Sequence, residues 1–201
     1  MKENILSLLF KKISILILLF GANGLNAQNI IWQKVIGGSK SDINSRVKPV
    51  SDGGYILCGY SNSNSSGDKS ENNQDTSLST YDFWIVKLDP LGNIQWENTI
   101  GGSKDDRLGD IIETPDGGFL VGGTSKSQMS GDKTENGCNP VNNYGDYWIV
   151  KINSAGIIEW QNTIGACGSE SLYSIDYTSD GGYLLGGISV SNISCDKTEN
   201  N

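Results

Sequence analysis

The chain has 201 residues with 23 acidic and 15 basic side chains, a formal net charge of −8, and no histidine. The absence of histidine excludes Ser-His-Asp and Cys-His catalytic relays and HExxH zinc sites. The acidic charge argues against a nucleic-acid ligand, whose phosphates require lysine and arginine. The length allows one domain or two small ones.

The first 27 residues have the pattern of a secretory signal peptide. Three lysines lie before the apolar run of residues 13–20, and a stretch of small and weakly polar residues ends at Ala27. We expect cleavage before Gln28 and a protein that is secreted or held at the cell surface, with no membrane span after cleavage. An uncleaved anchor is the alternative, but a spanning helix needs ~20 apolar residues.

The rest of the chain is one unit repeated with a period of 64 residues. A tryptophan followed by Ile-Gly four residues later recurs at that interval, as does the motif Asp-Gly-Gly followed by an aromatic residue. The motifs begin at Trp32, Trp96 and Trp160, and at Asp52, Asp116 and Asp180. A fixed period without gaps indicates one supersecondary unit copied along the chain.

Each unit is predicted to contain four short strands. They are rich in β-branched and aromatic residues and are separated by Gly, Asp and Asn turns, which is typical of an all-β protein. A long polar loop follows the second strand. In the second copy the strands are expected at residues 107–114, 119–125, 146–153 and 157–164.

Four antiparallel strands with tight first–second and third–fourth turns predict a blade of a β-propeller, with a β-solenoid as the alternative. The expected organisation is a signal peptide at 1–27, the outer strand of a preceding blade at 28–37, repeats at 38–101 and 102–165, and a truncated repeat at 166–201. Propellers close with ~4–8 blades, whereas this chain holds roughly two and three-quarters. We therefore expect a C-terminally truncated fragment, or self-association through the open blade if the chain is not a fragment.

The recurrent tryptophans and turn glycines are assigned to blade packing rather than to a ligand site, because they recur in strands and turns of every copy. These residues are Trp32, Trp84, Trp96, Trp148, Trp160, Gly53, Gly117 and Gly181.

One segment carries a family resemblance. Residues 88–96, Leu-Asp-Pro-Leu-Gly-Asn-Ile-Gln-Trp, resemble the tryptophan-docking repeat of quinoprotein-type propellers. The whole unit, with Asp-Gly-Gly-Tyr and Asp-Tyr-Trp-Ile-Val-Lys, is similar to repeats of secreted bacterial β-propeller proteins. The resemblance implies a secreted or surface propeller. Such proteins often end in a type IX secretion sorting domain, which is not visible here.

In a propeller, the polar loop and the connection between repeats share one face, so residues 101–106 are expected beside residues 130–136. Within the loop, oxygen ligands alternate as they do at the start of a calcium loop. The weak calcium candidates are Asp132, Thr134, Asn136, Asp68, Asn72 and Asp196. The alternative is a turn whose aspartate caps backbone N–H groups. No other cofactor is expected.

The cysteines do not recur with the period. Cys58 stands in a strand where later copies have glycine, which favours a buried thiol. Disulfides are permitted in an exported protein, and Cys138, Cys167 and Cys195 all map to the loop face. The bridges considered are Cys138–Cys167 and Cys167–Cys195. No CxxC spacing points to zinc or to a thioredoxin-like site.

The pair Asp105-Asp106 has the residue type of a glycosidase pair, but an acidic residue recurs at that position in every unit. A hydrogen bond that closes a turn or a blade explains such recurrence better than catalysis. The resulting hypothesis is a non-enzymatic interaction or adhesion scaffold that binds a protein or glycan at its loop face. The alternatives are a glycan-binding propeller lectin, with Tyr60 or Tyr144 as an exposed sugar platform, and a quinoprotein-like oxidoreductase fragment.

Overall fold

The computed structural model describes residues 32–75, 79–138 and 144–201, so the predicted signal peptide lies outside the described residues. The chain divides into two compact units, Met1–Gln33 and Lys34–Asn201, and the fold below belongs to the second. The described residues form ten strands and no helix. None of those residues belongs to a helix long and apolar enough to cross a membrane.

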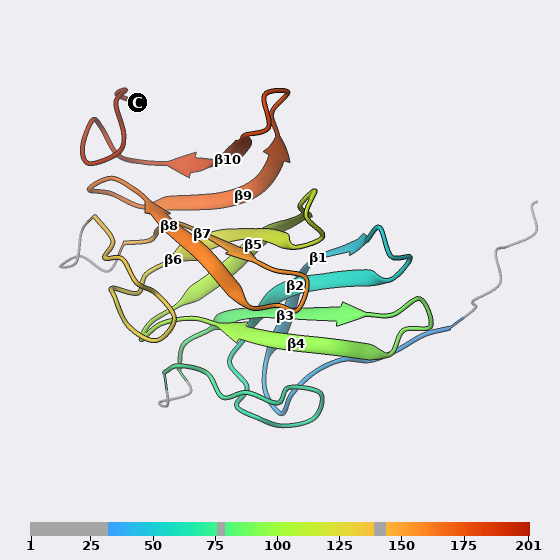
Figure 1. Ribbon diagram of the computed structural model, residues 1–201. Helices are drawn as coiled ribbons and strands as arrows, with labels where there is room; N and C mark the ends of the chain where they lie inside the picture. Colours follow the sequence, from blue (N-terminus) through green and yellow to red (C-terminus); the bar gives the residue numbers. More distant parts are fainter. Residues whose placement is uncertain (1–31, 76–78, 139–143) are drawn as a thin grey trace, which may run out of the picture. The chain divides into compact units, whose positions relative to one another are not determined.

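All sheets are antiparallel (Figure 1). One four-stranded sheet has the order β1-β2-β3-β4, a second has the order β5-β6-β7-β8, and β9 pairs with β10. The bounds are β1 Asp42–Pro49, β2 Tyr55–Ser61, β3 Asp82–Leu88, β4 Ile94–Ile100, β5 Asp106–Glu113, β6 Phe119–Ser125, β7 Asp146–Ile152, β8 Ile158–Ile164, β9 Glu170–Tyr177 and β10 Tyr183–Ser189.

The all-β prediction is confirmed for the described residues, and the strands of the second unit lie within one residue of their predicted bounds. Each strand of the second sheet begins 64 residues after its counterpart in the first. The outer strand expected at 28–37 is not seen in its described part, since residues 32–37 have no strand assignment. A strand requires a neighbouring strand for its backbone hydrogen bonds, and β1–β4 already form a complete ladder without this segment.

The first strand of each sheet carries an irregularity in register, at Asn44/Arg46 in β1 and at Leu108/Asp110 in β5. The extra residue is turned toward the next sheet, because a bulge re-aims a side chain. The hydroxyl of Ser45 donates a hydrogen bond to the Leu108 carbonyl, 2.7 Å away. A Cβ atom on the equivalent Gly109 would lie 2.3 Å from the Leu172 carbonyl oxygen. The bulges therefore bring the first strands of successive sheets into contact.

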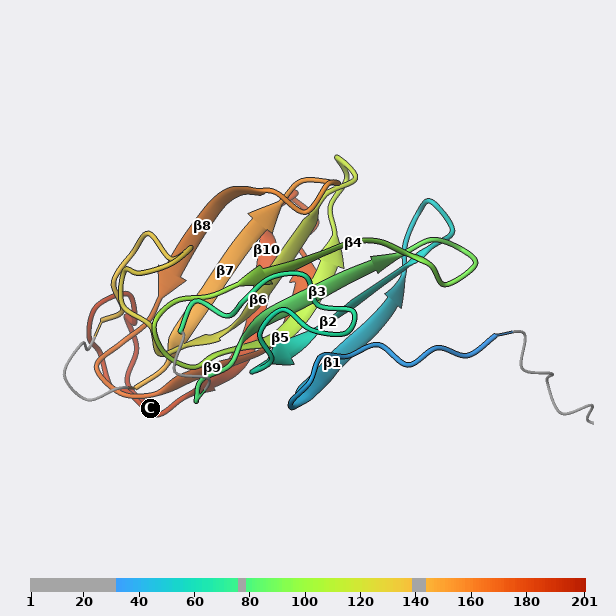
Figure 2. The same cartoon turned by 90° about the horizontal axis from the view of Figure 1, so that it is seen from below.

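The core lies between the faces of the sheets. The largest apolar cluster joins the first two sheets and includes Phe83 and Trp148, whose ring centroids are 5.1 Å apart. A second cluster joins β6 and β7 to β9, where Leu120 packs with Leu172 and Ile175. Gly122 permits this approach, since a Cβ there would lie 2.8 Å from the Ile175 side chain. Figure 2 shows the three sheets after a 90° turn.

Three of the five recurrent tryptophans lie in the packed interior or against a neighbouring sheet. Trp84 and Trp148 are buried. Trp96 packs on Phe119, and its Nε1 donates to the Ser154 carbonyl in the β7–β8 turn. Trp160 is 44% exposed. Trp160 is the counterpart of Trp96, but the described residues hold no later turn for it to cover.

The three turn glycines act through backbone conformation and not through packing. Gly53, Gly117 and Gly181 have φ between 80° and 87°, in the left-handed region that favours glycine. A Cβ on Gly117 or Gly181 would meet no atom within 4 Å. Their role is to close the tight turn between the first and second strands.

The sheet formed by β9 and β10 exposes apolar side chains that its predecessors bury. Leu184 is 62% exposed, whereas its counterparts Ile56 and Leu120 are fully buried. The difference arises because Leu120 is covered by β9, while no described strand covers Leu184.

Trp148→Ala should lower the free energy of unfolding by about 3–5 kcal/mol, because it leaves a cavity between two sheets. Urea denaturation followed by circular dichroism measures this change. Trp160→Ala removes the same side chain from an exposed position and should cost less than about 1 kcal/mol. Equal losses in the two variants would contradict the packing described here.

Candidate functional site: the loop face and an adjoining cleft

The loop face comprises the connections at residues 37–41, 101–105 and 165–169 and the polar loops at 62–75, 126–138 and 190–201. The expected proximity of the connection and the loop is confirmed. The N–H of Gly101 donates to Asp132 Oδ2, 3.1 Å away, and the N–H of Asp132 donates to the Gly101 carbonyl, 2.9 Å away. We call this reciprocal pair the Asp–Gly clamp.

The clamp occurs in every repeat. Asp68 makes both bonds with Gly37, and Asp196 makes both with Gly165. The asparagines of the calcium pattern are also engaged: Asn72 Oδ1 accepts from the N–H of Ser65.

Asn136 and Thr134, two more of the calcium candidates, also make hydrogen bonds within the protein. Asn136 Oδ1 accepts from the N–H of Met129, and the N–H of Thr134 donates to Gln161 Oε1. The structure therefore shows the loop-capping arrangement that was the alternative to calcium.

An acidic residue begins the first strand of each sheet; it is half-buried in the first sheet (Asp42) and buried in the other two. Asp106 is fully buried, and its Oδ2 accepts hydrogen bonds from the N–H of Gly102 at 2.7 Å and from the hydroxyl of Ser127 at 2.8 Å. Asp42 and Glu170 make the equivalent bonds to the preceding connection and to two serines. This repeated network supports the structural explanation of the acidic slot over catalysis.

A second buried carboxyl lies close to two of these acids, Asp82 to Asp106 and Asp146 to Glu170. Asp82, at the start of β3, accepts a hydrogen bond on Oδ2 from the N–H of Gln74 at 2.6 Å, and its Oδ1 has no hydrogen-bond partner among the described residues. Burial, followed by the negative charge of Asp106, raises the pKa of Asp82 to about 7. Burial raises the pKa of Asp106 itself to about 6, as it does for Asp146, the counterpart of Asp82.

A buried lysine follows the clamp aspartate. Lys69 Nζ donates to Thr99 Oγ1 at 2.6 Å and to the Glu71 carbonyl at 2.7 Å. Lys133 donates to Thr163 in the same way, and its ammonium lies 5.0 Å from the centre of the Trp148 ring. Burial lowers the pKa of Lys133 to about 8. The Asp-Lys dipeptide recurs visibly in the sequence, but only the fold shows that the lysine ties the loop to the outer strand.

An open cleft of about 670 Å³ lies along the first strands, next to the loop face. Its lining includes Arg46, Arg107 and Lys126, two tyrosines and several serines, and no carboxylate. Sequence reasoning missed the cleft, because its residues come from β1, β2, β5, β6, β9 and two loops.

Arg107 is held in place by its neighbours. Its guanidinium carbon lies 5.6 Å from the ring centre of Tyr60 and 5.2 Å from that of Tyr81, within cation–π range. Its NH2 atom also lies 3.2 Å from Asp105. Tyr60 therefore borders the cleft as part of an aromatic–arginine stack, whereas Tyr144 is 45% exposed and lies apart, beside Cys167.

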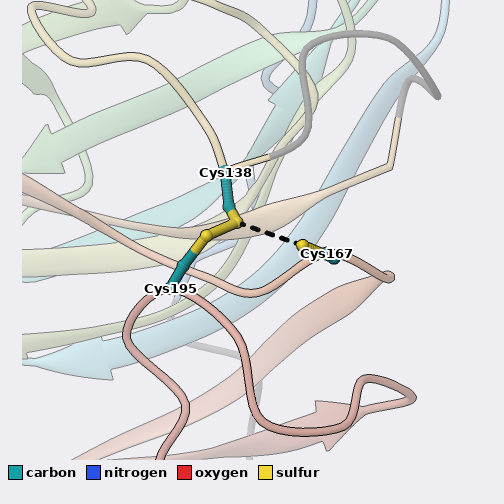
Figure 3. Close-up of side chains that lie close together, drawn as sticks. All are labelled: Cys138, Cys167 and Cys195. Atoms are coloured by element: carbon teal, nitrogen blue, oxygen red, sulfur yellow. Dashed lines mark hydrogen bonds between the residues drawn. A yellow bond between two sulfur atoms is a disulfide. The ribbon is translucent and has the colours of Figure 1, made fainter.

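The cysteines form a different arrangement from the two pairings considered. The disulfide joins Cys138 to Cys195, with a Cα–Cα distance of 6.4 Å, and Cys167 lies outside it (Figure 3). The structure shows neither of the two expected pairings. The loop face does bring the three cysteines together, as anticipated, but the loop conformation decided the partner. The prediction for Cys58 is confirmed: it is a buried thiol, and burial raises its pKa to about 12.

No protein-family model matches this chain, and no curated protein matches it significantly. The description of the site therefore rests on the geometry above.

Asp82→Asn should flatten the pH dependence of stability. A carboxyl whose pKa is raised by folding binds more protons in the folded state, so the free energy of unfolding falls as pH rises from about 4 to about 7. In Asp82→Asn, the decrease in the free energy of unfolding over this pH range should be smaller by on the order of 1 kcal/mol. Denaturation curves at pH 4.5, 6 and 8 measure it.

Asp116→Asn is the matched control. The hydrogen bond from Thr114, the backbone and Lys151 hold the pKa of Asp116 well below its usual range. It is therefore ionised at all three pH values, and its replacement should leave the slope unchanged. A slope that is the same in wild type and Asp82→Asn would show that Asp82 is ionised in the folded protein throughout this range.

Proposed function

We propose that this protein is an exported, non-enzymatic interaction scaffold built from β-propeller-type blades, and that it binds an anionic partner in the cleft beside its loop face. The signal-peptide pattern supports export. The repeat and the stacking of the sheets support the blades. The composition of the cleft carries the proposal for binding.

Contacts at both edges of the sheets support the propeller architecture. The first strands meet where the Ser45 hydroxyl reaches the Leu108 carbonyl. The fourth strand meets the next sheet where Trp96 Nε1 donates to the Ser154 carbonyl. Blades that stack face to face around an axis require contact at the inner and the outer edge together.

The single observation behind the binding proposal is the positive cleft on an acidic chain. The chain has a net charge of −8, yet the residues that line the cleft include three cations and no carboxylate. Arg46 and Arg107 also pair with Asp110 and Asp105, which lie outside the lining. Arg107 is oriented by two aromatic rings, and Lys126 makes no ion pair within the described residues. Serine hydroxyls and tyrosine rings on a cationic cleft suit a glycan that carries carboxylate or sulfate groups.

The other candidate functions gain less support. A propeller lectin with one pocket per repeat would need similar residues in each copy, but the cleft position Tyr60 is Thr124 and Ile188 in the later repeats. The resemblance to quinoprotein propellers concerns the repeat alone, and a fold does not imply its function.

Arg107→Ala combined with Lys126→Ala should weaken binding to acidic glycans at least 10-fold and reduce its salt dependence, because two cations that face the ligand are lost. An array of sulfated, uronic-acid and neutral glycans, probed with the whole chain at 50 and 300 mM salt, measures the effect.

Lys40→Ala is the control, since it removes an exposed lysine that does not line the cleft. Binding to neutral glycans alone, or equal binding by the control and the double variant, would contradict an anion-binding cleft. Turnover of any bound glycan would contradict the non-enzymatic assignment.

A further inference from the structure

Three sulfur atoms lie together at the loop face (Figure 3). Cys138 and Cys195 form the disulfide, and the Sγ of Cys167 lies 3.9 Å from the Sγ of Cys138. All three sulfurs lie within 4.8 Å of one another. Figure 3 shows Cys167 beside the bonded pair, with its closest sulfur contact to Cys138.

The cysteines occupy positions that have other residues one repeat earlier. Cys138, Cys167 and Cys195 lie 64 residues after Gln74, Ser103 and Gly131. Gln74 already packs on Gly131, since a Cβ on that glycine would lie 2.9 Å from Gln74 Cγ. The disulfide therefore replaces a contact that the fold makes without it.

Hydrogen bonds independent of the disulfide hold the three positions. The N–H of Cys167 donates to Ser194 Oγ at 2.9 Å, as the N–H of Ser103 does to Ser130 Oγ. The N–H of Cys138 donates to Asp146 Oδ2 at 2.9 Å, and the Asp–Gly clamp holds Asp196, next to Cys195. The sulfurs should stay close together whichever pair is bonded.

Cys195 has φ = 48°, in the left-handed region, where its counterparts Gly67 and Gly131 have φ of 60° and 57°. A residue with a Cβ is disfavoured there, because the Cβ crowds the carbonyl oxygen of the backbone. The cysteine side chain therefore occupies a position at which the backbone favours glycine.

We propose that Cys138, Cys167 and Cys195 form a thiol–disulfide exchange site, in which the disulfide moves between Cys138–Cys195 and Cys138–Cys167. The Cys167 thiol first gives its proton to solvent. Its thiolate attacks Cys138 Sγ, a Cys167–Cys138 bond forms, and the Cys138–Cys195 bond breaks. Cys195 leaves as a thiolate and takes up a proton. One disulfide and one thiol are present before and after, so no oxidant or reductant is needed.

Exchange changes what the loop face presents. With the disulfide at Cys138–Cys195, the exposed thiol is that of Cys167; after exchange it is that of Cys195. Both side chains belong to exposed residues. Either thiolate can attack an external disulfide, whose second sulfur leaves as a thiolate, and the mixed disulfide that forms would give the loop face a covalent mode of attachment. Cys58 does not compete, because it is buried in the core.

Disulfide mapping tests the exchange. The intact protein is held at pH 8.5 without added thiol, alkylated with N-ethylmaleimide under native conditions, and digested with trypsin and a glutamate-specific protease. Cleavage after Lys151 and Glu170 separates the three cysteines. We expect both linkages, Cys138–Cys195 and Cys138–Cys167, and label on both Cys167 and Cys195. A single Cys138–Cys195 linkage with label on Cys167 alone, unchanged over a day, would overturn the proposal.

Cys167→Ser is the first control, because serine is the residue of the two earlier repeats at this position. It should give the Cys138–Cys195 linkage alone and no label on Cys195. Linkages that include Cys58, or label on Cys195 in this variant, would mean that exchange proceeds through unfolding, and would also overturn the proposal.

Cys195→Gly restores the residue of the earlier repeats and leaves Cys138 beside Cys167. When the variant is incubated with oxidised glutathione, Cys138 and Cys167 should join in a disulfide as completely as the wild-type pair does. Two persistent mixed disulfides with glutathione, in a variant that keeps its circular dichroism spectrum, would show that these sulfurs cannot bond.

The correspondence of Gln74 and Gly131 to Cys138 and Cys195, 64 residues later, leads to a separate prediction. Gln74→Cys combined with Gly131→Cys should form a disulfide between the first two repeats on oxidation. Non-reducing peptide mapping measures its yield. Gln74→Cys alone is the control, and failure of the double variant to form the bridge while folded would show that the Gln74 and Cys138 positions differ.

Discussion

An acidic side chain at the start of each first strand, buried in the second and third sheets, is the interaction on which the loop face depends. Burying a charged or polar group is costly unless hydrogen bonds replace its water, so its position is specified by the donors around it. Asp106 accepts hydrogen bonds from the N–H of Gly102 in the preceding connection and from the hydroxyl of Ser127 in the following loop. One side chain thus ties three segments together, and Asp42 and Glu170 do the same in their repeats.

Around this acid, the Asp–Gly clamp and the buried lysine complete the loop. The clamp joins Asp132 to Gly101, and Lys133 reaches across to Thr163 on the outer strand. A long polar segment without regular structure is thereby held on both sides. A loop anchored in this way can present side chains in fixed positions, which is the property that a binding surface needs.

The two functional proposals use positions where the repeats differ from one another. The scaffold residues recur every 64 positions, while Tyr60, Arg107 and Lys126 in the cleft do not recur with them. The cysteines are also confined to single repeats and replace Gln74, Ser103 and Gly131 of the preceding copy. The strands and loops are thus the same in each repeat, while the side chains at the cleft and cysteine positions differ from one repeat to the next.

The sequence by itself determined the strands, the tight turns and the period, because these depend on local patterns: alternation in β7, positive-φ glycine at Gly117, and recurrence of both. It also placed three cysteines on one face. It did not reveal which of them bond, because that depends on the conformation of loops 57 residues apart in the chain. Nor did it reveal the cleft, the burial of Lys133 or the exposure of Trp160, since each depends on which sheet lies opposite. Those features were decided by tertiary contacts between separate repeats, which no local pattern encodes.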